Sequence, residues 1–315
     1  MSGSSLGPGG EFDAIRRMIA VWGPVAVGVG DDAAVLDVPA GERLCVSTDA
    51  SVENVHFRRG WLTPEEIGYR AIVAALSDLA AMGARPLGVL VALTLPPAWR
   101  ADLDAIARGM GEAATAHHAH IVGGDTTAGA ELSLAVTVLG TARAPLARGG
   151  ARPGDLVYVT GALGGSLAAL RELLAGREPA PADRLRFARP RARIREAPWL
   201  AERGARAAVD ISDGLAADLA HVAYASGVRV HLDLDRVPRA PGVSARDAAT
   251  SGEEYELAVT APGELDAAAF AAEFGIGLTA IGTVEAVGPG ESPGVEVRAA
   301  GARVDLPRGH DHLSS

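Results

Sequence analysis

The chain of 315 residues contains no lysine, one cysteine and few aromatic residues. Without lysine there is no Walker A motif, no protein-kinase strand lysine and no Schiff base. The single cysteine, Cys45, excludes an intramolecular disulfide and any paired-cysteine zinc or redox site. If the protein handles nucleotide phosphates, it must therefore do so with metal ions, backbone N–H groups and arginine.

A basic surface and long apolar runs are also missing. The formal net charge is −10, which argues against a nucleic-acid partner, because phosphate backbones require a basic face. No stretch of about 18 apolar residues is free of charges or turn signals, and the N-terminus lacks the features of a signal peptide. We therefore expect a soluble, cytoplasmic protein without membrane contact. Its core should consist mainly of Ala, Val, Leu and Ile, because only 4% of its residues are aromatic.

Strand-like apolar runs alternate with alanine-rich helical runs, which predicts mixed α/β architecture. The predicted strands are 43–48, 88–95, 132–139, 155–160, 206–211, 228–233, 255–260 and 278–284. The predicted helices are 11–21, 64–82, 98–118, 163–175 and 214–226. The segment 144–155 has the Pro and Gly density of a domain boundary. We predict a flexible tail over 1–10, an N-terminal domain over 11–147 and a C-terminal domain over 148–315. A Pro- and Arg-rich stretch, 178–198, is interpreted as a long connection.

The helix predicted over 64–82 carries an unusual carboxylate. Thr63 and Glu66 match a capping box at its start, and Gly83 is placed to end it. Asp78 lies on its apolar stripe and in its last turn, and both positions penalise an anion. A bound cation would relieve both penalties, and so would bonds to an arginine or to backbone N–H groups.

Six aspartates in all lie in short segments edged by Gly, Ser or Thr. They are Asp32 in GVGDDAA, Asp49 in STDAS, Asp78 in ALSDLAA, Asp125 in GGDTT, and Asp210 and Asp213 in DISDGL. Most follow an apolar, strand-like stretch, and the ends of strands are where α/β proteins place ligand-binding groups. Clustered carboxylates repel one another unless a cation lies among them, and such hard oxygen ligands suit Mg²⁺. An aspartate before a helix is usually a cap, however, and in DISDGL either Ser212 or Asp213 would fill that role.

Three further motifs have structural alternatives. GALGGS, at 161–166, resembles a phosphate-binding turn, although a tight strand-to-helix connection is the interpretation we favour. HHAH, at 117–120, lies at a predicted helix end, where histidine is favoured without any metal. For HDH, at 310–312, the sequence does not decide between a metal-binding and a structural role.

In their order along the chain, these segments resemble the thiamine-monophosphate kinase family, a relative of aminoimidazole ribonucleotide synthetase and selenophosphate synthetase. The ten motifs are GDD (30–32), STD (47–49), VENVHF (52–57), LSDLAAMGA (76–84), GGDT (123–126), RGGARPGD (148–155), VTGALG (159–164), DISDGL (210–215), GEEYEL (252–257) and GHDH (309–312). The resemblance implies a two-domain aminoimidazole ribonucleotide synthetase-like fold of α/β (α+β) type. Its N-terminal mixed-sheet domain would form a homodimer, with an α/β domain following.

The resemblance also implies an activity: phosphoryl transfer from ATP to thiamine monophosphate, giving thiamine diphosphate with the help of several Mg²⁺ ions. No catalytic side chain is required, because a phosphate oxygen is already a nucleophile. The implied metal contacts are Asp32, Ser47, Thr48, Asp49, Asp78, Asp125, Asp210 and Asp213. The implied ATP contacts are Gly124, Asp125, Arg148 and Ser212. The implied substrate contacts are His56, Glu253 and His310.

The chain departs from the family pattern at four positions. Asn54 replaces a glycine, although Asn tolerates the left-handed conformation. Glu254 replaces an aspartate, and His310 and Leu313 replace aromatic residues. A related phosphotransferase with another acceptor and a non-catalytic nucleotide-binding protein therefore stay as alternatives. No cysteine lies where selenophosphate synthetase or the hydrogenase-maturation relative needs one, and a mere binder would not need six aspartates.

Overall fold

The computed structural model describes residues 9–30 and 32–306. It contains two compact units, one formed by residues up to 79 and 84–145, the other by 80–83 and the residues from 146 onward. None of the helices in the described ranges is both long and apolar enough to cross a membrane.

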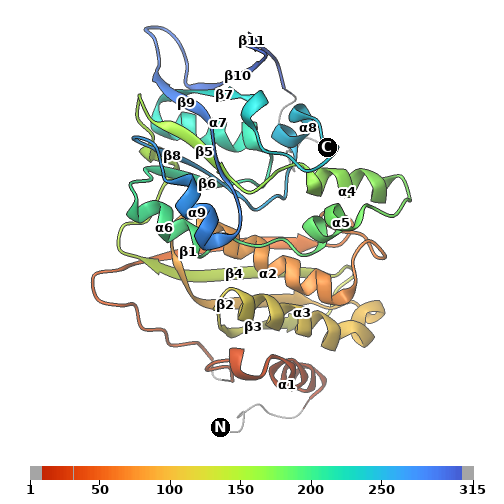
Figure 1. Cartoon of the computed structure of the whole chain (residues 1–315). Coiled ribbons are helices and arrows are strands. Elements are labelled where there is room, and N and C mark those ends of the chain that lie inside the picture. The colour runs from red at the N-terminus through yellow and green to blue at the C-terminus, as the bar shows by residue number, and fades with distance from the viewer. Residues whose placement is uncertain (1–8, 31, 307–315) are drawn as a thin grey trace. The chain divides into compact units, whose positions relative to one another are not determined.

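The N-terminal unit is built on a four-stranded sheet in the order β1–β4–β2–β3 (Figure 1). Its strands are β1 (Arg43–Val52), β2 (Arg85–Thr94), β3 (Ile121–Thr127) and β4 (Ser133–Ala142). Its helices are α1 (Gly10–Trp22), α2 (Pro64–Ala81) and α3 (Leu103–Ala116). Strands β2 and β3 are parallel, whereas β4 runs antiparallel to both β1 and β2. The two edge strands are therefore β1 and β3.

Helix α2 covers one face of this sheet. Alternate residues of the two central strands, such as Val91 and Val136, are buried on that face, as expected for a strand with one covered side. The predicted capping box is confirmed, because the Thr63 N–H donates to Glu66 Oε2 (2.8 Å) and the Glu66 N–H to Thr63 Oγ1 (3.2 Å). Helices α2 and α3 cross closely through glycine: a Cβ on Gly68 would lie 2.1 Å from the Ile106 carbonyl oxygen.

Two predicted elements of this unit differ from the structure, and one strand was not predicted. The helix predicted over 98–118 is a 3-10 turn, Pro97–Asp102, followed by α3. Strand β1 continues past Asp49 because β4 pairs with its whole length. The GGDTT segment lies inside β3, which the sequence did not predict as a strand because its glycines are typical of a turn.

The C-terminal unit contains a seven-stranded mixed sheet in the order β11–β10–β7–β9–β5–β8–β6. Its strands are β5 (Leu156–Thr160), β6 (Ala207–Asp210), β7 (Val228–Asp233), β8 (Leu257–Ala261), β9 (Leu278–Ala286), β10 (Gly294–Ala299) and β11 (Ala302–Arg303). Its helices are α4 (Gly165–Leu174), α5 (Pro181–Ala188), α6 (Glu196–Glu202), α7 (Leu215–Ser226), α8 (Ala245–Thr250) and α9 (Ala267–Phe274).

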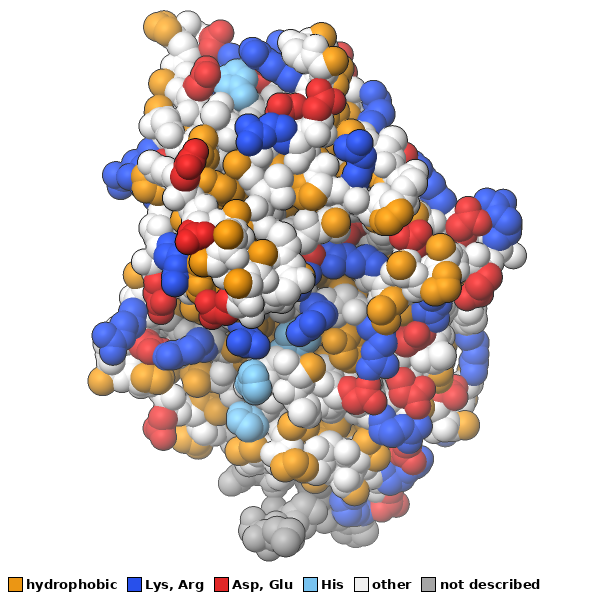
Figure 2. Space-filling view, in the orientation of Figure 1, with side chains coloured by type: hydrophobic (Ala, Val, Ile, Leu, Met, Phe, Trp, Pro, Cys, Tyr) orange, Lys and Arg blue, Asp and Glu red, His pale blue; other side chains and the backbone are white. Residues whose placement is uncertain are grey.

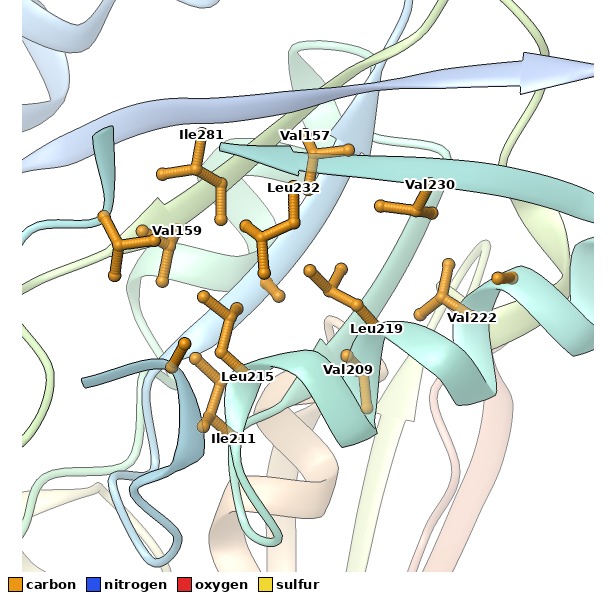
Figure 3. Close-up of a cluster of buried hydrophobic side chains, with 14 of the residues drawn as sticks. Val157, Val159, Val209, Ile211, Leu215, Leu219, Val222, Val230, Leu232 and Ile281 are labelled. Atoms are coloured by element: carbon orange, nitrogen blue, oxygen red, sulfur yellow. The ribbon is translucent and has the colours of Figure 1, made fainter. Parts of the chain in front are cut away.

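Helix α7 supplies much of the core of this unit. Its Leu215, Leu219 and Val222 point toward buried side chains of the sheet, among them Val230 and Leu232 (Figure 3). The interpretation of 178–198 as a connection is wrong, because α5 and the start of α6 lie there.

The surface carries charges of both signs. On the face shown in Figure 2, arginine side chains and carboxylates are interspersed with scattered apolar residues. The net charge of −10 is thus not gathered into one acidic patch on this face.

Candidate active site

In the N-terminal unit, strand β1 and helix α2 bring two predicted metal ligands together. Ser47 Oγ donates a hydrogen bond of 2.5 Å to Asp78 Oδ2. Asp78 is half-buried in the last turn of α2. A hydroxyl donor satisfies an oxygen atom but carries no positive charge, so this bond leaves the penalty from the helix dipole in place. The pair is therefore a suitable oxygen ligand set for a cation.

Asp49 and Asp125 lie far apart within one chain. Along the sheet, Asp49 is opposite Val136 of β4, Val136 is opposite Val91 of β2, and Gly124 of β3 pairs with Val91. Three strand spacings of about 4.8 Å amount to roughly 14 Å. Asp49 shares the α2 face with Ser47, two residues earlier, whereas Asp125 follows Gly124 and points to the other face. The prediction that Asp49 follows the end of its strand is wrong, because β1 continues to Val52, and Asp125 lies inside β3.

Other predicted residues of this unit occupy different positions. Thr48 points away from the face of Ser47, and its Oγ1 lies 2.9 Å from Thr137 Oγ1 on β4. Asp32 is exposed in the segment that precedes β1. Gly124 lies in β3 beside Asp125, with φ 152°, and a Cβ there would lie 1.9 Å from the Val91 carbonyl oxygen.

The VENVHF turn fixes the ring of His56. Asn54 has φ 65°, as expected from its tolerance of the left-handed region. The Val52 N–H donates to His56 Nδ1 (3.1 Å), and Arg70 donates to the His56 carbonyl oxygen (3.1 Å). Because Nδ1 accepts, the neutral ring carries its proton on Nε2. His56 is therefore prepared to donate from Nε2.

In the C-terminal unit, the DISDGL and GEEYEL motifs pack against each other. The N–H of Glu253 donates to the Ser212 carbonyl oxygen (2.8 Å), and those of Glu254 and Tyr255 donate to the Ile211 carbonyl oxygen (3.1 and 3.0 Å). Glu253 and Tyr255 have φ values of 55° and 53°. Non-glycine residues in this region store strain of about 1–3 kcal/mol each, and such strain concentrates at functional sites.

Asp218, which the sequence analysis missed, holds the DISDGL turn. Its Oδ2 accepts from the N–H groups of Ser212, Asp213 and Gly214 at 3.1, 3.2 and 3.1 Å. The N-cap of α7 is Gly214, without a side-chain cap, so the expected capping by Ser212 or Asp213 is wrong. Burial, and then the charges of Asp210 and Asp213, raise the pKa of Asp218 from 3.8 to about 8.

A signal for Asp218 was present in the sequence. With Leu215, Leu219 and Val222 it forms the buried stripe of α7, as Asp78 does on α2. The carboxylates of Asp213 and Asp218 and the ring of His221, which is exposed, offer ligand atoms within 4.8 Å of one another. Asp210, at the end of β6 as predicted, is buried.

The GALGGS turn is filled by the protein's own carboxylate. Glu254 Oε1 accepts from the N–H groups of Gly164 (2.8 Å) and Ser166 (3.2 Å) and from Ser251 Oγ (2.5 Å). The structural interpretation of this turn is therefore confirmed. Burial raises the pKa of Glu254, and the Arg186 guanidinium beside it opposes that rise.

Two family models match the chain. The N-terminal domain model of AIR synthase related protein matches residues 30–142, and the C-terminal domain model matches 152–292. Thiamine-monophosphate kinase of Salmonella typhimurium is 38% identical over 272 residues, which are 80% of this chain and 83% of that protein. The Bacillus subtilis enzyme of that name is 36% identical over 274 residues, 81% and 84% of the two chains. The chain belongs to the thiamine-monophosphate kinase family.

Solved structures of the family have the same fold. Thiamine-monophosphate kinase from Stenotrophomonas maltophilia superposes with a TM-score of 0.79 at 35% identity, covering 93% of this chain and 96% of that one. The structure of AaThiL complexed with AMPPCP and TMP superposes with a TM-score of 0.76 at 30% identity. The match covers 96% of this chain and 95% of that one. Hydrogenase maturation protein HypE superposes with a TM-score of 0.78 at only 22% identity, a likeness that shows the shared fold alone. The predicted two-domain, aminoimidazole ribonucleotide synthetase-like fold is confirmed.

The remaining motif residues of this thiamine-monophosphate kinase family member are less constrained. Arg148 is exposed in a short 3-10 turn, and its carbonyl oxygen accepts from Ser226 Oγ (2.8 Å). Glu253 is half-buried. His310 and Leu313 lie outside the described residues.

Proposed function

We propose that this chain is a thiamine-phosphate kinase that transfers the γ-phosphoryl group of ATP to thiamine monophosphate, the last step of thiamine diphosphate biosynthesis. The observation that carries the proposal is the likeness over 96% of the chain to a family member whose structure holds AMPPCP and TMP. Two pairings of family motifs support the same activity: Ser47 with Asp78 in the N-terminal unit, and DISDGL with GEEYEL in the C-terminal unit.

The donor set of the motifs fits Mg²⁺. The ligands proposed to hold several ions are Asp32, Ser47, Thr48, Asp49, Asp78, Asp125, Asp210 and Asp213. Carboxylate and hydroxyl oxygens are the ligands that Mg²⁺ prefers, and the hydrogen bond from Ser47 leaves the charge of Asp78 unneutralised. When bound, Mg²⁺ supplies the positive charge that offsets the phosphates in a protein without lysine.

The contributions of the chain itself are binding and orientation. We propose that Gly124, Asp125, Arg148 and Ser212 contact ATP. We propose that His56, Glu253 and His310 contact thiamine monophosphate, with His56 donating from Nε2. A phosphate oxygen of the substrate is the nucleophile, so the protein needs no general base and acts by holding the two phosphates in line.

We also propose that two chains pair through their N-terminal domains. Strand β1 is an edge strand, and its Leu44 and Val46 are 48% and 58% exposed. Pairing would cover these apolar side chains and the edge of β1. We further propose that residues 11–147 form the domain that binds most of the ATP and metal, and that residues 148–315 form the C-terminal synthetase-like domain. We place the reaction in the cytoplasm.

Product analysis tests this function directly. The purified protein is incubated with ATP, Mg²⁺ and thiamine monophosphate, with thiamine as the matched control acceptor, and the products are separated by chromatography. We expect thiamine diphosphate from the monophosphate alone. ADP released with no thiamine diphosphate would contradict the proposal and indicate a different acceptor.

A further inference from the structure

We infer that Asp218 is a positioning residue of the phosphoryl-transfer site, which fixes the DISDGL turn so that Ser212 and Asp213 present their side chains to nucleotide and metal. This inference rests on the proposed function. It assigns Asp218 no direct contact with either substrate.

Three donors converge on one oxygen atom of Asp218. The N–H groups of Ser212, Asp213 and Gly214 lie 3.1, 3.2 and 3.1 Å from Oδ2. Asp218 is only 2% exposed, so these bonds are shielded from competing water. One buried carboxylate therefore sets the direction of three successive peptide groups.

If the side chain of Ser212 or Asp213 held this turn, it would not be available to a nucleotide or a metal ion. The first N–H groups of a helix need acceptors, and these normally come from a Ser, Thr, Asp or Asn at the N-cap. Here the N-cap is Gly214, whose φ is 116°, and it offers no side chain. Asp218 reaches back from the first turn of α7 and accepts the N–H groups of Ser212, Asp213 and Gly214, which lie just before the helix. The turn is thus held by a residue outside it, and neither Ser212 nor Asp213 has to hold it with its own side chain.

The opposite side of the same turn is held by backbone. The Ser212 carbonyl oxygen accepts from the Glu253 N–H at 2.8 Å. A Cβ on Gly252 would lie 2.6 Å from that carbonyl oxygen, so only glycine permits this close approach of the two segments. Asp218 on the N–H side and the GEEYEL segment on the carbonyl side thus clamp one short turn.

The position itself favours an apolar residue. Leu215, Leu219 and Val222, its neighbours on the inner stripe of α7, are all buried in the core of the unit (Figure 3). An aspartate on this stripe is costly unless its bonds compensate. Its placement is explained by the turn that it holds.

Three variants separate positioning from mere stability. Asp218→Ala removes the acceptor, Asp218→Asn keeps a side-chain oxygen that can accept the same N–H groups, and Val222→Ala creates a cavity on the same helix face without touching the turn. Binding of Mn²⁺ is measured by electron paramagnetic resonance, which needs no turnover. The Mg²⁺ requirement and kcat are then measured in the kinase assay, at a temperature well below the Tm of every variant.

We expect Asp218→Ala to weaken Mn²⁺ binding and raise the Mg²⁺ requirement by about 10- to 100-fold, as for other residues that orient metal ligands. Asp218→Asn should stay within about threefold of the wild type, less than the effect of losing an orienting partner. Val222→Ala should leave both quantities unchanged.

Two results would overturn the role of Asp218. One is wild-type metal affinity in Asp218→Ala; the other is an equal loss in Asp218→Asn, which would make the carboxylate a direct ligand. A wild-type protein that binds Mn²⁺ but forms no thiamine diphosphate would instead contradict the proposed function.

Discussion

Replacing Glu256 with glutamine should strongly destabilise the C-terminal unit. Glu256 is fully buried and accepts from Thr160 Oγ1 (2.6 Å), Arg186 Nη2 (2.5 Å) and Arg193 Nε (2.6 Å). Arg186 also donates from Nε to Glu254 (3.1 Å). Two buried carboxylates thus balance two guanidinium groups. Burial raises the pKa of Glu256, but Arg193 and Arg186 outweigh it and hold the pKa below 4.5.

The magnitude follows from the charge left behind. In Glu256→Gln, Arg193 stays buried without its main counterion. Removing one partner of a buried ion pair costs about 3–5 kcal/mol. For a unit of this size, each kcal/mol lowers Tm by about 2–4 °C, which gives a loss of roughly 6–20 °C.

The assay is urea and thermal unfolding followed by circular dichroism and calorimetry, with each transition analysed separately because two units need not unfold together. Glu172→Gln is the matched control, since Glu172 forms an exposed pair with Arg177 (2.6 Å). It should leave Tm unchanged. A Tm for Glu256→Gln equal to that of the control would refute the reasoning.

Three further predictions concern the turn, the metal ligands and pH. Asp49→Asn and Asp125→Asn should each lower turnover by more than the roughly 100-fold loss seen for outer partners of a metal, with unchanged circular dichroism; wild-type activity in both would contradict the metal assignment. Asn54→Gly should leave Tm nearly unchanged, whereas Asn54→Val should cost about 1–3 kcal/mol in the left-handed region, and equal Tm values for the two would contradict the turn assignment. In EDTA, the raised pKa of Asp218 should make the free energy of unfolding fall as pH rises from 4 to about 8, at most by about 1.4 kcal/mol per pH unit. Asp218→Asn should remove this component, and parallel pH curves for the two proteins would contradict it.

Local signals in the sequence predicted local structure well. The capping box of Thr63 and Glu66 starts α2 as expected, because it depends on residues three apart. Asn54 takes a positive φ, as its tolerance of the left-handed region predicts. The position of Asp78 on an apolar stripe predicted that its carboxylate needs a partner. The structure provides the Ser47 hydroxyl, not an arginine or a backbone N–H group.

Features that depend on distant partners could not be predicted. The stretch 178–198 resembles a loop because its prolines are unfavourable inside helices. Its Arg186 and Arg193 find their counterions at Glu254 and Glu256, far away in the sequence. The separation of Asp49 from Asp125 follows from the strand order, about which sequence spacing says nothing. Asp218, like Asp78, is a carboxylate on the apolar face of a helix, which is a signal that the sequence contains. It lies outside the DISDGL motif, however.

The most direct test of the central claim follows the transferred group itself. The protein is given ATP labelled at the γ-phosphate, Mg²⁺ and unlabelled thiamine monophosphate, and the location of the label is determined after separation. We predict label in the terminal phosphate of thiamine diphosphate and none in inorganic phosphate beyond the enzyme-free control. Label in inorganic phosphate alone, with no labelled thiamine diphosphate, would contradict direct transfer between the two substrates.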